Sequence, residues 1–214
     1  RDVYKRQIEH LTQSNIKTNT LRRKIACMKV FYNYLKYQNI IEENPFNQLR
    51  FQFRTEKILP KTIPYDILKS IFIYLEQKVI VSKTDYQKQH AERNLLIISL
   101  LLSTGIRISE LCHIHLKDIN LSNKTLHIIG KGKKERILFL GDQKTFNLLE
   151  TYINKTRNES NDFLFPGKHS LKPLSEQSVR LVIKRIVEQN NFSRTITPHM
   201  FRHSFATCLL YTSL

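Results

Sequence analysis

Hydrophobic residues recur at spacings of three and four along much of this chain, a pattern typical of amphipathic helices. The first repeat begins near residue 18 and consists of Leu21, Ile25, Met28, Phe31 and Leu35. Pro64 and Asp66 open a second predicted helix. A third is expected over about 85–104, where Gly105 provides a stop, and a short helix follows from Ile108.

Two later stretches alternate hydrophobic and polar residues instead, as strands do. They are Thr125–Ile129 and Glu135–Leu140, and the turn between them is rich in glycine and lysine. Together they predict a β-hairpin. Helices are expected again at about 142–156 and 175–190, and Thr197-Pro198 suits a helix start. The predicted fold class is mainly α with a small β-hairpin or sheet.

Residues 51–62 interrupt the helical pattern. They are polar and basic, include Pro60 and show no hydrophobic face, which predicts an interdomain linker. The linker separates a short helical segment, residues 8–50, from a larger one, residues 63–207.

The two ends share an unusual relation. Residues 2–7 can be encoded as GATGTGTATAAGAGACAG, and the reverse complement, read one base out of frame with a T added, encodes residues 208–213. Such inverted ends resemble the transposase mosaic end used to tag sequencing libraries. Residues 1–7 and 208–214 are therefore expected to be adapter-derived and to contribute nothing to the fold.

The charge of the chain favours a polyanionic partner. Lys and Arg number 35 against 18 Asp and Glu, a formal net charge of +17. Such an excess suits DNA, RNA or an anionic membrane, although it is also compatible with a generally basic soluble protein.

The best apolar run, 95–102, is too short to span a membrane. Three widely spaced cysteines, Cys27, Cys112 and Cys208, indicate reduced thiols and a cytoplasmic location.

Three separate places carry candidate chemistry. Arg107 follows the helix break with Glu110 three residues on, and His199 and Arg202 share one face of the last predicted helix. Between them lies the lysine-rich turn, residues 130–136. Each place also has a plainer interpretation. Arg107 and Glu110 could be a surface ion pair, His199 a packing histidine, and the lysine-rich turn a solvated hairpin tip. Jointly they favour a cationic clamp for a phosphate.

The sequence disfavours two other kinds of site. The Gly-Lys-Gly-Lys-Lys turn lacks the spacing of a nucleotide-binding P-loop. Cys112, His113 and His115 suggest a metal site, but no second cluster completes four ligands, so packing and surface roles are favoured. No metal and no cofactor are expected.

The three motifs resemble those of the tyrosine recombinases, the phage integrase and Xer-like family. Leu-Ser-Thr-Gly-Ile-Arg-Ile-Ser-Glu-Leu (102–111) resembles the first arginine box, residues 128–136 the catalytic-lysine hairpin, and Thr-Pro-His-Met-Phe-Arg-His (197–203) the His-x-x-Arg box. The resemblance spans roughly 15–207. It implies that residues 8–50 are part of a SAM-like helical core-binding domain and that residues 63–207 are an incomplete catalytic domain.

The resemblance also implies roles. Arg107 and Arg202 would bind the scissile phosphate, His199 would assist proton transfer, and Lys131 would be the general acid. Glu110 and His203 would support these residues. Contacts with double-stranded DNA are expected from the basic residues Lys133, Lys134, Arg136, Arg22, Arg23 and Lys24. The family cuts and rejoins DNA through a 3′-phosphotyrosyl intermediate without a cofactor.

The family's nucleophilic tyrosine has no counterpart among these motifs. Tyr211 lies in the apparent adapter, nine residues after Arg202, and is rejected as the nucleophile. The chain is therefore expected to be an inactive, monomeric fragment of an enzyme that forms a tetramer on DNA. The alternative is a non-catalytic DNA-binding regulator, which would not need the clustered arginines, histidine and lysine.

Overall fold

The structure is a computed structural model that describes residues 6, 16–47, 61–130, 132, 134–156, 162–167 and 172–212, the last five without side chains. The chain divides into an N-terminal unit, residues 1–59, and a C-terminal unit, residues 60–214. Most of the predicted linker and of the apparent adapter ends lies outside the described residues.

The described part of the N-terminal unit is built on one helix, α2 (Thr18–Tyr37), which confirms the first predicted helix. Its inner face is small: Leu21 and Ile25 pack with Phe46 in a cluster of buried residues. The side-chain amide of Asn44 donates to the Lys29 carbonyl (3.1 Å) and fastens the returning chain to the helix. The basic residues predicted to contact DNA in this unit, Arg22, Arg23 and Lys24, are exposed.

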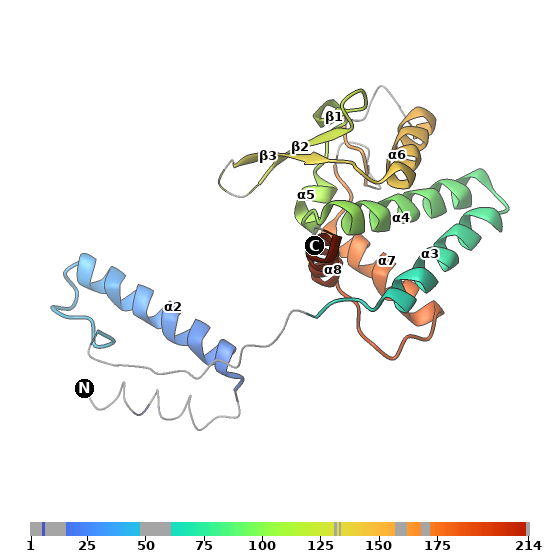
Figure 1. Ribbon diagram of the computed structural model, residues 1–214. Helices are drawn as coiled ribbons and strands as arrows, with labels where there is room; N and C mark the ends of the chain where they lie inside the picture. Colours follow the sequence, from blue (N-terminus) through green and yellow to red (C-terminus); the bar gives the residue numbers. More distant parts are fainter. Residues whose placement is uncertain are drawn as a thin grey trace. The chain divides into compact units, whose positions relative to one another are not determined.

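Six helices form most of the described part of the C-terminal unit: α3 (Tyr65–Ile80), α4 (Asp85–Thr104), α5 (Ile108–Cys112), α6 (Gln143–Thr156), α7 (Glu176–Gln189) and α8 (Pro198–Thr212). Helix α4 is central and packs against α3, α6 and α8 (Figure 1). Residues 96–101 on α4 are each at most 4% exposed, because neighbours cover this part of the helix all round. The third predicted helix is confirmed.

A three-stranded antiparallel sheet lies beside these helices (Figure 1). Its strands are β1 (Ile119–Asn120), β2 (Thr125–Ile129) and β3 (Glu135–Phe139). The predicted hairpin is confirmed, with Ile128 opposite Arg136. The sequence did not predict β1 or the preceding 3-10 helix η1 (Leu116–Asp118), since two or three residues are too few to show a period.

Both ends of α4 are capped, and the cap at its C-terminal end, Gly105, is the one that the sequence predicted. The Thr84 hydroxyl accepts from the backbone N–H of Gln87 (3.2 Å). At the other end Gly105 has a left-handed φ of +59°. A Cβ on Gly105 would lie 2.3 Å from Cδ1 of Phe205 on α8. Glycine is needed here for two reasons, the backbone conformation and the close approach of a neighbouring helix.

Helix α8 begins at Pro198, as predicted, and ties together distant parts of the C-terminal unit. The hydroxyl of Ser204 accepts from the buried backbone N–H of Ile63 (2.9 Å), 141 residues earlier, and donates to the Met200 carbonyl (2.9 Å). The segment that enters this unit is therefore fixed to its last helix.

Candidate active site

The first arginine lies in a tightly capped corner between α4 and α5. The backbone N–H of Arg107 donates to Oε2 of Glu110 (2.9 Å), and the Arg107 guanidinium Nη1 donates to Oε1 of the same carboxylate (2.9 Å). One side chain thus caps α5 and orients Arg107. Arg107 and Glu110 are thus paired through both backbone and side chain, and a catalytic role for either one remains a prediction.

Arg136 on β3 joins the same carboxylate from the other side. Its Nη1 donates to Glu110 Oε1 (3.0 Å) and its Nη2 donates to Oε2 (2.7 Å), a bidentate pair. The sequence predicted Arg136 only as a DNA contact and did not indicate this partner. No period or motif links two residues that are 26 positions apart on different elements.

Glu110 is nearly enclosed, with its side chain 5% exposed. Burial disfavours its ionised form, but hydrogen bonds from Arg136 and Arg107 favour that form more strongly. The pKa of Glu110 therefore lies below the ordinary glutamate value. The carboxylate is charged at neutral pH and holds two guanidinium groups.

Arg202 reaches this corner from α8. Its Nη1 donates to the carbonyl of Gly105, 97 residues earlier, at the turn that precedes Arg107. Burial lowers the pKa of Arg202, and the positive charges of Arg107 and Arg136 lower it further, against the opposing effect of Glu110. Three guanidinium groups and one carboxylate therefore gather at the C-terminal end of α4. Their net positive charge suits an anion.

A groove of about 990 Å³ opens beside these side chains. Arg107, Glu110, Lys134 and Arg136 line it together with residues of β2 and the segment after α5. Arg202 is not among its lining residues. His199 and His203 are exposed on the first turns of α8. Lys131 and Lys133 lie outside the described residues, so their predicted positions stay predictions.

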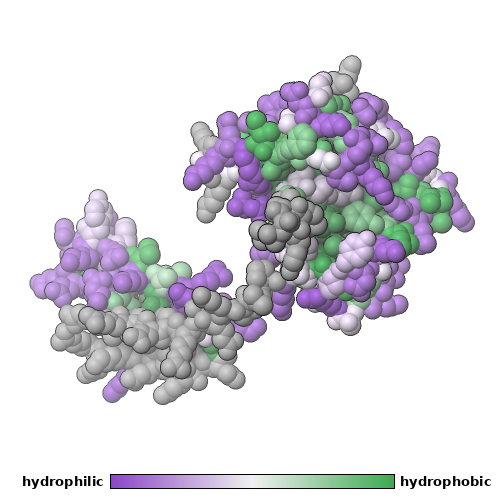
Figure 2. Space-filling model, viewed as in Figure 1, coloured by the Kyte–Doolittle hydropathy of each residue, from purple (hydrophilic) through white to green (hydrophobic). Residues whose placement is uncertain are grey.

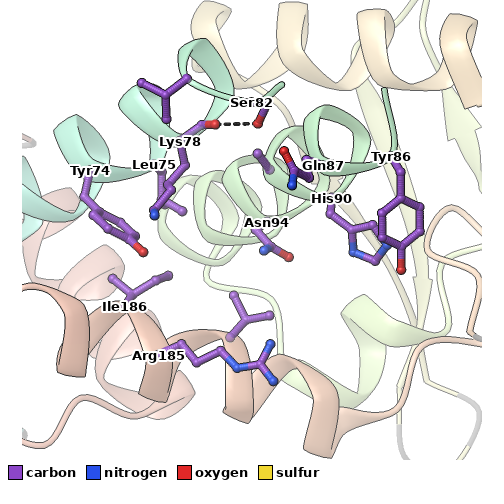
Figure 3. Close-up of a pocket in the computed structure, with 13 residues that line it drawn as sticks. Tyr74, Leu75, Lys78, Ser82, Tyr86, Gln87, His90, Asn94, Arg185 and Ile186 are labelled. Atoms are coloured by element: carbon purple, nitrogen blue, oxygen red, sulfur yellow. Dashed lines mark hydrogen bonds between the residues drawn. The ribbon is translucent and has the colours of Figure 1, made fainter. Parts of the chain in front are cut away.

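A second, smaller cavity of about 440 Å³ lies between α3, α4 and α7 (Figure 3). Lys78, Asn94 and Arg185 line it with apolar side chains such as Ile186. In the described part of the chain, the buried Oδ1 of Asn94 has no hydrogen-bond partner. None of the predicted site residues lines this cavity.

The cysteine and histidines after Glu110 have local roles. Cys112 is 1% exposed, and burial raises the pKa of its thiol to about 12. Nδ1 of His113 lies 2.8 Å from the Ser109 carbonyl oxygen, and the ring of His115 packs on Phe163. Within the described residues, no group of three or more His, Cys, Asp or Glu side chains is placed to hold a metal ion.

The surface in Figure 2 is mostly hydrophilic where residues are described, with hydrophobic residues between the polar ones. Among the helices that the structure describes, none combines the length and apolar character needed to cross a membrane.

Comparison with known proteins agrees with the motifs. The phage integrase family model matches residues 74–213. A tyrosine recombinase from Agathobacter rectalis is 47% identical over 197 residues, and tyrosine recombinase XerC from Bacillus subtilis is 31% identical over 205 residues. These alignments cover 91% and 92% of this chain but 64% of each relative. The chain thus spans just under two thirds of the relatives' length.

Solved structures share the fold. The XerH recombinase in its pre-cleavage complex with difH substrate has a TM-score of 0.72 and 25% identity, covering 96% of this chain and 58% of that one. The Tn1549 transposon integrase in complex with circular intermediate DNA has a TM-score of 0.67 and 21% identity, covering 98% and 72%. With its motifs, its fold and a family match over residues 74–213, this chain belongs to the phage integrase family of tyrosine recombinases.

Proposed function

We propose that this chain is part of a site-specific DNA recombinase that cuts and rejoins DNA through a 3′-phosphotyrosyl intermediate. The observation that carries the proposal is the meeting of two distant motifs. Arg202 from the His-x-x-Arg box donates to the Gly105 carbonyl, two residues from Arg107 of the first arginine box. A DNA-binding regulator would need exposed basic residues, but not this cluster around a buried carboxylate.

The proposed roles follow from the charges. Arg107 and Arg202 bind the scissile phosphate and stabilise the added negative charge of its pentacoordinate transition state. Glu110 orients Arg107 and, because it is ionised, keeps the cluster from carrying three uncompensated positive charges. His199 and His203, exposed on α8, are assigned to proton transfer and to its support.

The bond changes proposed for the reaction need no external energy source. A tyrosine hydroxyl gives its proton to His199 as its oxygen attacks phosphorus, the bond to the 5′ oxygen breaks, and Lys131 delivers a proton to that leaving oxygen. The phosphotyrosyl bond conserves the energy for rejoining. The attacking tyrosine is not assigned to any residue of the printed sequence.

Double-stranded DNA is the proposed partner, and a tetramer on DNA in the cytoplasm the proposed working form. The related XerH structure is bound to difH substrate, and the related Tn1549 integrase structure is in complex with circular intermediate DNA. In this chain Arg22, Arg23 and Lys24 on α2 and Lys134 at the groove are exposed and basic, as contacts with DNA phosphates require.

A salt titration of duplex binding tests the partner. Neutralising about six phosphates predicts a loss of roughly three decades of affinity between about 50 and 200 mM salt. Arg107→Ala should weaken binding more than Arg180→Ala, which removes the same charge from an exposed pair with Glu176 on α7. A flat salt response in filter binding would contradict DNA as the partner. Equal losses in the two variants would contradict a role for the cluster in binding.

A nicked suicide substrate tests the chemistry. The printed sequence is expected to give no covalent adduct on a denaturing gel, because clamp residues stabilise an attack but supply no attacking oxygen. An adduct that Tyr211→Phe abolishes would identify Tyr211 as the nucleophile and overturn that expectation.

A further inference from the structure

Arg136 has a contact that its proposed role on DNA does not explain. It lies on β3, opposite Ile128 of β2, at the end of the strand pair that leads into the lysine-rich turn. Both terminal nitrogens of its guanidinium donate to Glu110, at 3.0 and 2.7 Å. Glu110 belongs to α5, so this pair joins the sheet to the helix that follows Arg107.

The base of the turn lies directly on this pair. Gly130 is the residue after β2, and its N–H donates to the Lys134 carbonyl (2.7 Å) to close the turn. A Cβ on Gly130 would stand 3.5 Å from Oε1 of Glu110 and 3.9 Å from Nη1 of Arg136. Lys131 is the next residue along the chain. The residue before Lys131 therefore lies close enough to the ion pair that a side chain there would touch it.

We propose that Arg136 is a positioning residue, whose bidentate ion pair with Glu110 fixes the base of the hairpin that carries Lys131 relative to Arg107. The inference rests on the proposed recombinase function for the meaning of Lys131 and Arg107. The coupling of the hairpin to α5 through the ion pair does not depend on that function. In this proposal the carboxylate of Glu110 positions two groups at once. These are Arg107, which binds the phosphate, and β3, which adjoins the turn that carries Lys131.

The arrangement favours positioning over a phosphate contact by Arg136. Its side chain is 32% exposed, against 51% for Arg107, and both terminal nitrogens are occupied by Glu110. A planar guanidinium can bind both carboxylate oxygens at once and so fixes orientation as well as distance. A lysine at this position can make one contact but cannot fix orientation in the same way.

Hydrogen exchange of the whole chain, followed by mass spectrometry over residues 125–139, tests the coupling. Arg136→Met should speed exchange there about tenfold, the size expected for losing a charge-assisted hydrogen bond, and leave α4 unchanged. Arg136→Lys should restore part of the protection. Arg180→Met is the matched control, because it removes the same charge from an exposed ion pair on α7 and should leave the hairpin unchanged.

A double-mutant cycle separates positioning from direct DNA contact. Glu110→Gln alone should speed hairpin exchange, and Arg136→Met should add little to it. Additive effects, or faster exchange throughout α4, would overturn the proposal. Duplex affinity is measured on the same variants. If the unchanged chain binds no DNA, the proposed function fails while the exchange cycle still decides the coupling. If DNA binds but the cycle is additive, only the coupling fails.

Discussion

The arginines of the site are held in two different ways. Arg107 and Arg136 are held by the buried carboxylate of Glu110, whereas Arg202 is held by the backbone carbonyl of Gly105. The first anchor, Glu110, is an ionisable group and depends on charge. The second anchor, the Gly105 carbonyl, is uncharged and depends on how closely α8 packs against the end of α4. We call Glu110 the electrostatic anchor. We call the Gly105 carbonyl the steric anchor, because its place beside Arg202 depends on the close packing of α8 against α4.

Gly105→Ala should cause the largest loss, because it disturbs the steric anchor. The new Cβ would lie 2.3 Å from the Phe205 ring on a backbone with φ of +59°. Together these effects should lower the free energy of unfolding by about 2–4 kcal/mol in urea denaturation. Gly132→Ala is the control: its φ is +78° but nothing lies within 4 Å, so a loss of about 1 kcal/mol is expected. Equal losses would show that close packing does not matter at Gly105.

Glu110→Gln should have an intermediate effect on the electrostatic anchor. The amide has no charge, and its NH₂ group cannot accept from the arginines. Since the arginine partners are partly exposed, the expected loss of unfolding free energy is about 1–2 kcal/mol. Glu176→Gln breaks an exposed pair with Arg180 and should cost less than about 1 kcal/mol. If Glu110→Gln and Glu176→Gln lower the free energy of unfolding equally, burial of Glu110 adds nothing to the strength of its ion pairs.

Acid should weaken only the electrostatic anchor. The folded-state pKa of Glu110 lies below 4.5, so its stabilisation is fully present above that pH and is lost as the pH falls through the lower folded value. The difference in unfolding free energy between the unchanged chain and Glu110→Gln should shrink on that descent. The difference in unfolding free energy between the unchanged chain and Gly105→Ala should stay the same, because no ionisable group forms that anchor. Denaturation curves on either side of pH 4.5 measure both.

Cys112 offers the smallest and most local readout. Its thiol is buried and, with a pKa of about 12, protonated at neutral pH, so a thiol reagent should label it slowly. In a background with serine at 27 and 208, Glu110→Gln should raise the labelling rate modestly, since α5 carries both residues, and Gly132→Ala should not. An unchanged rate in Glu110→Gln would show that α5 stays closed without its carboxylate anchor.

Local patterns predicted most of the fold. Helices α3, α4 and α8 begin near their expected first residues, because periodicity and capping are properties of neighbouring residues. The order of motifs likewise indicated Arg107, Glu110 and Arg202. Contacts between distant elements were missed. The residues around Gly105 in the sequence do not predict its close approach to Phe205. Likewise, the residues around Arg136 do not predict its ion pair with Glu110. Such pairs are decided by packing in three dimensions, which periodicity does not record.

The hydrogen bond from Ile63 to Ser204 has a consequence for synthesis of the protein. These residues are 141 positions apart, so this contact requires closing a very long loop. During translation, the segment around Ile63 and helix α4 leave the ribosome well before α8 is synthesised. Until Ser204 emerges, the buried amide of Ile63 lacks its acceptor and the end of α4 lacks the ring of Phe205. Assembly of the arginine cluster is therefore a late event, completed only when the last helix arrives.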